Sequence, residues 1–185
     1  MRYLQRGVTV HDAGRSAAGF TLFAPLLQRE VYLIEMVGEV VHQWEIPGQP
    51  GNYGKLQPNG NLLVSTMSEN GPAGLAARGG LIQELDWDGN LIWNFSDPRD
   101  GYRYHHVFKR IWNNHLNDWT VIFTSMIPMT QEQAVAAGAD PSVEWDAGPD
   151  GVVEVDMNGN VVWEWWSLDH VVQDKNPSWP NYGVL

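Results

Sequence analysis

The chain has 185 residues, of which 43% are hydrophobic and 11% aromatic, and this composition predicts a folded core rather than a disordered chain. Ten Trp, with 19 Gly and 11 Pro, favour short strands joined by tight turns, so an all-β fold is expected. The net charge of −11, with only 11 Lys and Arg, is opposite to that of a surface that binds phosphates, and we expect no nucleic-acid partner.

The absence of Cys is typical of a reducing compartment, and residues 1–10 show no secretory signal. No stretch approaches the roughly eighteen apolar residues that a membrane span requires. We therefore expect a soluble, cytoplasmic protein with no membrane partner.

A repeated hairpin is the strongest pattern along the chain. It occurs at residues 31–44, 81–95 and 152–165, each time as two apolar runs around a Gly and ending in aromatic residues. Gly89 and Gly159 stand in Asp-Gly-Asn and Asn-Gly-Asn turns, where a tight hairpin needs positive φ. The spacing is close to that of propeller blades, with an insertion lengthening the last interval.

A weaker hairpin lies between the copies, at residues 53–64 and again at residues 105–123. Four strands per unit result, which predicts a β-propeller of four-stranded blades, with this chain forming about half of a six-bladed ring. We interpret residues 1–185 as a single partial propeller domain with the following parts: the outer strands of a closing blade (31–46), a full blade (53–96), a full blade (104–167) with an insertion (127–149), and the start of another blade (176–185).

Within the insertion, Thr130 followed three residues later by Gln133 is a helix-start signal, and Gly138 is placed to end the helix.

An open arc of blades would expose apolar faces and unpaired strand edges. We therefore expect a second polypeptide that completes the propeller.

Several motifs together carry a resemblance to a known family. These are the hairpin at residues 151–165, the Asp169-His170 pair after it, the Pro-Asn-Gly-Asn turn at residues 58–61, the opening segments within residues 7–25, and His105-His106. In these motifs the chain resembles the arylsulfotransferase-like β-propellers, a family with blade repeats of the PQQ and WD type.

The resemblance implies an enzyme that transfers a sulfuryl group through a histidine, acting on a small molecule, such as a sulfated aromatic compound, in the axial channel. It places His105 and His106 at the channel, one of them as the nucleophile or general base, since a neutral imidazole is a competent nucleophile near neutral pH. His170, beside Asp169, is a third catalytic candidate.

The substrate-binding candidates are Arg103, Tyr104, Tyr53 and Asp169, with Arg103 as the cation for an anionic ligand. Tyr53 lies in Asn52-Tyr53-Gly54, at the place where the family has a His pair in the preceding blade.

Two other functions remain open. A transition metal held by His105, His106 and His170 would make the chain part of a metalloenzyme, although no cofactor is predicted. A propeller without catalysis could instead serve as a binding or assembly platform. The Asp86 and Asp156 turns have too few oxygen ligands for calcium and are interpreted as hairpin turns. His42 is interpreted as a packing residue.

Overall fold

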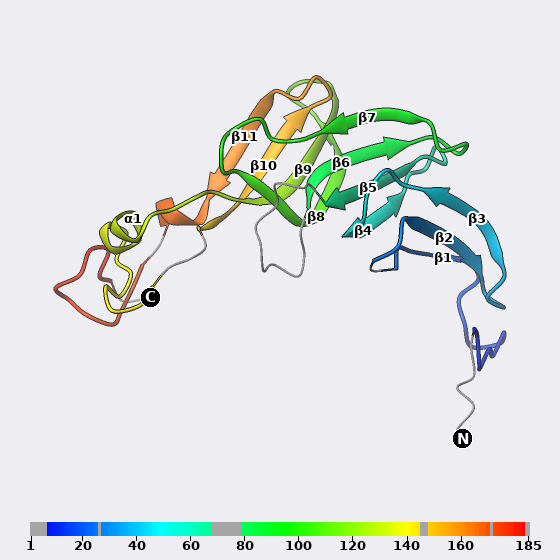
Figure 1. Ribbon diagram of the computed structural model, residues 1–185, viewed down its shortest axis with the longest axis horizontal. Coiled ribbons are helices and arrows are strands. Elements are labelled where there is room, and N and C mark those ends of the chain that lie inside the picture. The colour runs from blue at the N-terminus through cyan, green and yellow to red at the C-terminus, as the bar shows by residue number, and fades with distance from the viewer. Residues whose placement is uncertain (1–6, 26, 68–78, 145–147, 171, 184–185) are drawn as a thin grey trace.

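The computed structural model describes residues 7–25, 27–67, 79–144, 148–170 and 172–183. Over these residues the chain folds into three antiparallel sheets with one short α-helix and one 3-10 turn, which confirms the all-β expectation. Every sheet is a meander in which strands that are consecutive in sequence lie side by side. Figure 1 shows the three sheets following one another along an arc.

The strand bounds follow the repeat. The first sheet contains β1 (Phe20–Phe23), β2 (Glu30–Glu35) and β3 (Val40–Glu45); the second contains β4 (Pro50–Leu56), β5 (Leu62–Met67), β6 (Gly80–Leu85) and β7 (Leu91–Phe95); the third contains β8 (Arg103–Asn113), β9 (Asp118–Met126), β10 (Asp150–Asp156) and β11 (Val161–Trp166). The second and third sheets thus cover the segments expected to form four strands each.

The first sheet has one strand more than the two expected within residues 31–46. Strand β1 pairs antiparallel with β2, from Phe20 opposite Glu35 to Phe23 opposite Tyr32. Because β1 precedes β2 as β5 precedes β6, the first sheet lacks, over the described residues, a strand corresponding to β4 and β8.

The two repeated hairpins turn as predicted, with Gly89 at φ +87° and Gly159 at φ +84°. An Asp carboxylate closes each turn: Asp86 accepts from the backbone N–H of Asn90 at 2.8 Å, and Asp156 accepts from that of Asn160 at 2.8 Å. A hairpin therefore accounts for both Asp residues.

The predicted helix is also confirmed. Helix α1 (Gln131–Ala136) begins after Thr130, whose hydroxyl accepts from the Gln133 N–H at 3.2 Å while the Gln133 side chain accepts from the Thr130 N–H at 2.8 Å. This reciprocal capping satisfies two N–H groups that a helix start leaves unpaired.

After β11 the chain forms the 3-10 turn η1 (Ser167–His170), and no strand occurs between residues 172 and 183. The start of a blade expected over 176–185 is thus not seen in its described part. Two prolines, Pro177 and Pro180, lack the N–H that a strand ladder requires. The Asn181 side chain instead donates to the Ala137 carbonyl at 3.0 Å, which holds this segment against α1.

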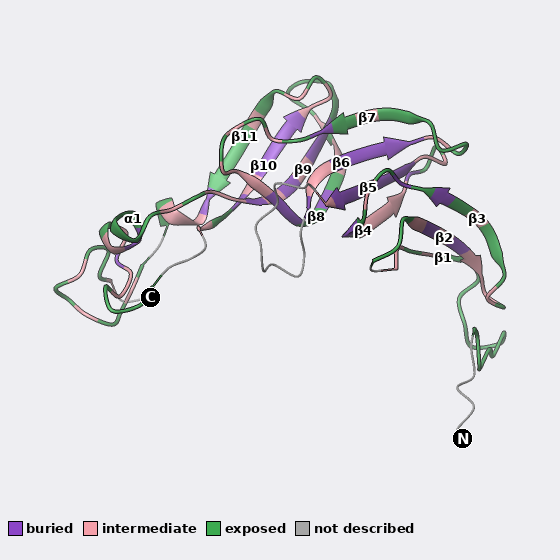
Figure 2. Ribbon diagram, viewed as in Figure 1, coloured by how far each residue is buried: buried purple, intermediate pink, exposed green. Residues whose placement is uncertain are grey.

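The core lies between consecutive sheets. One cluster joins the first sheet to the second and is centred on Val31, Trp44 and Leu62, and the other joins the second to the third and is centred on Ile82, Phe108 and Val153. Figure 2 shows burial concentrated in the middle strands, while β7 and β11 are largely exposed. The first and second sheets are therefore each covered on one face by the sheet that follows.

No helix formed by the residues that the structure describes is long and apolar enough to cross a membrane.

Candidate functional site

The candidate site lies on a bulge in β8. His105 pairs with Thr124 of β9 and Phe108 with Phe123, so His106 and Val107 are extra residues on the β8 side. His106 adopts φ +59°, a left-handed conformation that is uncommon outside glycine. Bulges of this kind change the direction in which side chains point.

A register shift also occurs in β4, between Pro50 and Gly54, so the first strands of both four-stranded sheets are bulged near their beginnings. In β4 the shifted segment carries Tyr53 rather than a histidine.

The bulge brings the two imidazoles into contact. Nδ1 of His105 lies 2.7 Å from Nδ1 of His106, with the rings nearly perpendicular. His105 is buried and His106 is exposed. The Thr124 hydroxyl donates to the His105 carbonyl, and the Tyr104 hydroxyl donates to the His106 carbonyl at 3.2 Å, so the backbone of both histidines is held in place.

Asp150, at the start of β10, faces the other side of the His105 ring. Its Oδ1 atom lies 3.1 Å from His105 Nε2, in a polar contact that is not aligned as a hydrogen bond. The sequence analysis missed Asp150, because its proximity to His105 arises from strand pairing across β9. Its position at the start of a strand is a signal, but one shared with many Asp residues.

These contacts define the protonation pattern. Burial lowers the pKa of His105, with His106 acting in the same direction and Asp150 opposing both. A neutral His105 carries one ring proton, and the Asp150 carboxylate favours that proton on Nε2. His105 Nδ1 is then an acceptor, so His106 Nδ1 must be the donor of the 2.7 Å contact. In a neutral His106 ring, Nε2 then carries the lone pair, and this ring is exposed.

Of the two tyrosines of the predicted site, Tyr104 belongs to the core and Tyr53 packs against it. Tyr104 is only 3% exposed and packs against Phe108 and Phe123, and burial raises the pKa of its phenol. Tyr53 packs edge to face on Phe108, with ring centroids 4.9 Å apart. Both rings therefore pack against Phe108 of β8.

Arg103 lies two residues before His105, at the edge of a polar hollow of about 240 Å³ that Asp97, Arg99, Asp100 and Tyr102 also line. Its guanidinium donates to the Tyr102 carbonyl at 2.8 Å. The guanidinium is therefore held beside the backbone of its neighbour Tyr102, at the edge of this hollow.

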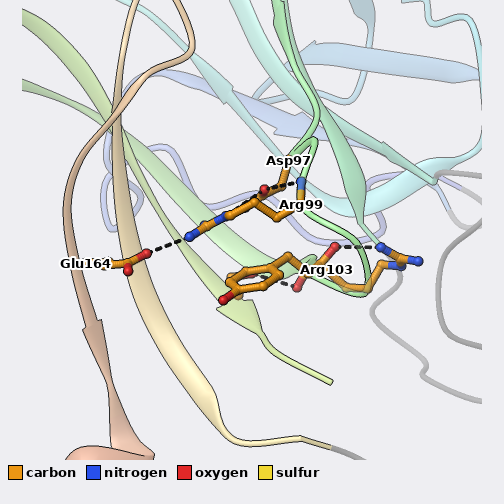
Figure 3. Close-up of polar contacts among 6 residues, drawn as sticks. Asp97, Arg99, Arg103 and Glu164 are labelled. Carbon is orange, nitrogen blue, oxygen red and sulfur yellow. Dashed lines mark hydrogen bonds and ion pairs between the residues drawn. The ribbon is translucent and has the colours of Figure 1, made fainter. Parts of the chain in front are cut away.

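The sequence analysis did not select Arg99, whose side chain is held by several contacts. It forms ion pairs of 2.7 Å with both Asp97 and Glu164, and its guanidinium stacks on the Tyr102 ring. These contacts, the Asp97 hydrogen bond above all, raise the pKa of Arg99. Figure 3 shows Arg99 extending toward Glu164 while Arg103 points the other way. Arg99 therefore ties the β7–β8 connection to β11.

Asp169 and His170 lie apart from the histidine pair. Both are in η1 after β11, at the opposite edge of the sheet from β8, and the His170 ring stacks on Trp165 with centroids 5.0 Å apart. Three strand spacings separate the two edges, roughly 14 Å. The structure therefore does not bring His170 to His105 and His106. Among the described residues, no three His, Asp or Glu side chains are grouped to hold a metal ion.

The fold and site define an all-β chain of antiparallel meanders with a histidine pair on a bulged strand. No protein-family model matches the chain, and a search of curated proteins finds no match. Among solved structures, the chain is similar to a protein of unknown function from Bacteroides caccae, with 17% identity and a TM-score of 0.47. That match covers 80% of this chain and 46% of the other, so the chain spans about half the length of the structure it matches.

Proposed function

We propose that the chain is part of an arylsulfotransferase-like β-propeller and that His106 is its nucleophile for sulfuryl transfer. The observation that carries the proposal is the series of contacts from Asp150 through His105 to His106, which leaves His106 Nε2 exposed with a lone pair. The arc of meander sheets and the family resemblance of the motifs support the architecture. A second polypeptide would complete the ring.

In the proposed step, the His106 Nε2 lone pair forms a bond to the sulfur of an aryl sulfate. The bond from sulfur to the phenolic oxygen breaks, and the phenolate leaves with the electron pair. The positive charge that develops on the His106 ring is stabilised because His106 Nδ1–H points at His105 Nδ1. Arg103 is the nearby cation for the sulfate oxygens. In the second step the oxygen of a phenol acceptor forms a bond to sulfur as the bond from sulfur to His106 Nε2 breaks and its electron pair returns to Nε2. The proton of the acceptor phenol goes to solvent or to the phenolate released in the first step.

The test uses the protein purified under native conditions with 4-nitrophenyl sulfate as donor and a phenol as acceptor. Release of nitrophenolate and the mass of the peptide that carries His106 are both measured. We expect His106→Asn to abolish both signals, and Asn is suited to this position because it tolerates positive φ. Asp150→Asn should slow the reaction by about 10²-fold, because His105 loses its orienting carboxylate.

His115→Asn is the matched control, since His115 lies in the β8–β9 turn away from the bulge. This variant should react like the unmodified protein. Sulfuryl label on another residue, or full activity of His106→Asn, would refute the proposal.

A further inference from the structure

The same kind of hydrogen bond occurs at both inter-sheet interfaces of the described residues. Between the first and second sheets, His42 Nε2 donates to the Trp87 carbonyl at 2.8 Å. Between the second and third, Trp93 Nε1 donates to the Met157 carbonyl at 2.9 Å. Trp87 and Met157 occupy the same place in their hairpin turns, directly after Asp86 and Asp156. A ring N–H on the last strand of one sheet thus binds the turn of the next sheet.

Trp163 is the third member of this series. It pairs with Glu154, as Trp93 pairs with Glu84 and His42 with Leu33. Trp163 is 47% exposed, and no hydrogen bond of its indole to any described residue is present.

The neighbouring aromatic position shows the same change in burial. Trp44 is 1% exposed and Phe95 is 6% exposed, whereas Trp165 at the corresponding position of the third sheet is 39% exposed. The first two are covered by a following sheet and the third is not.

A second pair of positions, one from each facing sheet, also corresponds between the two interfaces. At the first interface both positions are apolar: Leu33 lies in the buried core cluster, and Leu56 packs against that cluster. At the second the pair is ionic, with Glu84 Oε2 2.8 Å from Arg110 Nη1. Leu56 and Arg110 correspond because their partners in the adjacent strands, Leu62 and Val121, hold the same register.

Glu154 occupies the Glu84 position in the third sheet and is only 7% exposed. Its Oε1 atom accepts from Asn113 at 2.8 Å and from Thr120 at 2.6 Å, as Glu84 Oε1 accepts from Asn61 at 2.7 Å. Glu154 Oε2, which corresponds to the oxygen that binds Arg110, has no partner within the described part of the chain.

We infer that the outer face of the third sheet, formed by Val152, Glu154, Trp163 and Trp165, binds a further four-stranded sheet of the same repeat carried by a second polypeptide. That sheet presents an Arg or Lys on its first strand to Glu154 and a turn carbonyl to Trp163. The inference rests on the ring architecture in the proposed function, and not on the histidine chemistry.

A second copy of this chain fits this face less well. The residue opposite Glu154 would come from the strand that corresponds to β4 and β8, and the first sheet lacks that strand over the described residues. Each copy also carries a net charge of −11, which disfavours self-association. A partner with a basic residue opposite Glu154 would neutralise the charge of its carboxylate.

The test places a photo-crosslinker on this face in the cells that produce the protein. Trp163→p-benzoylphenylalanine is compared with Trp119→p-benzoylphenylalanine. Trp119 is a suitable control because it is 46% exposed, close to the value for Trp163, but lies on β9 and is not part of the proposed binding face. Peptides crosslinked after irradiation are sequenced by mass spectrometry. We expect position 163 to capture a hairpin-turn peptide of the same repeat from a second polypeptide, one that carries Arg or Lys on the first strand of that sheet.

Two further variants test the charge. Glu154→Lys should lower the crosslinking yield at position 163 by about tenfold or more, because a Lys at this position repels the Arg or Lys that the partner is proposed to present. A tenfold loss of binding corresponds to about 1.4 kcal/mol. Glu154→Gln keeps the size and an acceptor oxygen and should give a smaller loss, while Glu39→Lys, at an exposed position, should have no effect.

Capture of residues 30–45 from a second copy, capture of an unrelated peptide, equal yields at positions 163 and 119, or no capture would overturn the inference. Sulfuryl labelling of His106 is a separate measurement, so failure of this interface and failure of the proposed chemistry can be told apart.

Discussion

The buried ion pair between the second and third sheets gives the sharpest stability prediction. Glu84 is 1% exposed, and its two oxygens bind Arg110 and Asn61. Replacement of Arg110 by Leu leaves the Glu84 carboxylate buried without its counter-charge. Loss of one partner of such a pair costs about 3–5 kcal/mol. For a chain of this size, that corresponds to a fall in Tm of roughly 6–20 °C.

The double variant has a natural precedent in the same chain. Glu84→Leu with Arg110→Leu recreates the apolar pair, Leu33 and Leu56, found at the preceding interface. Replacement of a buried ion pair by packed apolar residues is often neutral or stabilising by about 1–4 kcal/mol. We therefore expect the double variant to regain the stability that Arg110→Leu loses.

The assay is urea unfolding followed by Trp fluorescence, with the free energy of unfolding obtained for all four members of the double-mutant cycle. Lys109→Leu is the matched control, since Lys109 is exposed on the same strand. A loss below about 1 kcal/mol for Arg110→Leu, or a double variant no more stable than that single variant, would show that the pair does not join the sheets as described.

Three smaller predictions follow from local contacts. Asp156→Ala removes the acceptor for Asn160 and should lower the free energy of unfolding by about 1 kcal/mol, measured by urea titration. Thr130→Ala should increase amide exchange in the first turn of α1, because the Gln133 N–H loses its acceptor; unchanged exchange would contradict the capping role. Since the pKa of His105 is lowered from its ordinary value of 6.5, the unfolded state binds the proton more readily, and stability should fall as pH drops below about 6.5. His105→Asn should reduce this pH dependence, and an unaltered profile would rule out His105 as its source.

Features set by neighbouring residues could be predicted from the sequence. Gly89 and Gly159 identify their turns because few residues tolerate positive φ, and Thr130 with Gln133 identifies the start of α1. Each of these signals lies within a few residues of the structure it specifies.

Features set by tertiary contacts could not be predicted. Strand β1 is four residues long, with three exposed, so its sequence shows no buried alternating face. The start of a blade was expected over residues 176–185; within the described part of that range the Asn181 side chain donates to the Ala137 carbonyl beside α1, a contact between residues 44 positions apart. Asp150 reaches His105 only through the pairing of β10, β9 and β8, and strand alternation does not reveal the bulge that brings the two histidine rings together.

Comparison of the three sheets distinguishes residues that occupy the same interface position in each sheet from residues that occur in one sheet alone. His42 can stand where Trp93 and Trp163 stand because the acceptor is a backbone carbonyl, so any ring N–H of suitable reach can fill the position. The predicted packing role of His42 agrees with this, since its ring also stacks on Trp87 at 3.8 Å. His105 and His106 have no such counterpart in β4, where the bulge recurs without imidazoles. The bulge therefore belongs to the repeat and the histidine pair does not. Because departures from a local pattern are expected at functional positions, this contrast is the structural reason to test His106 first.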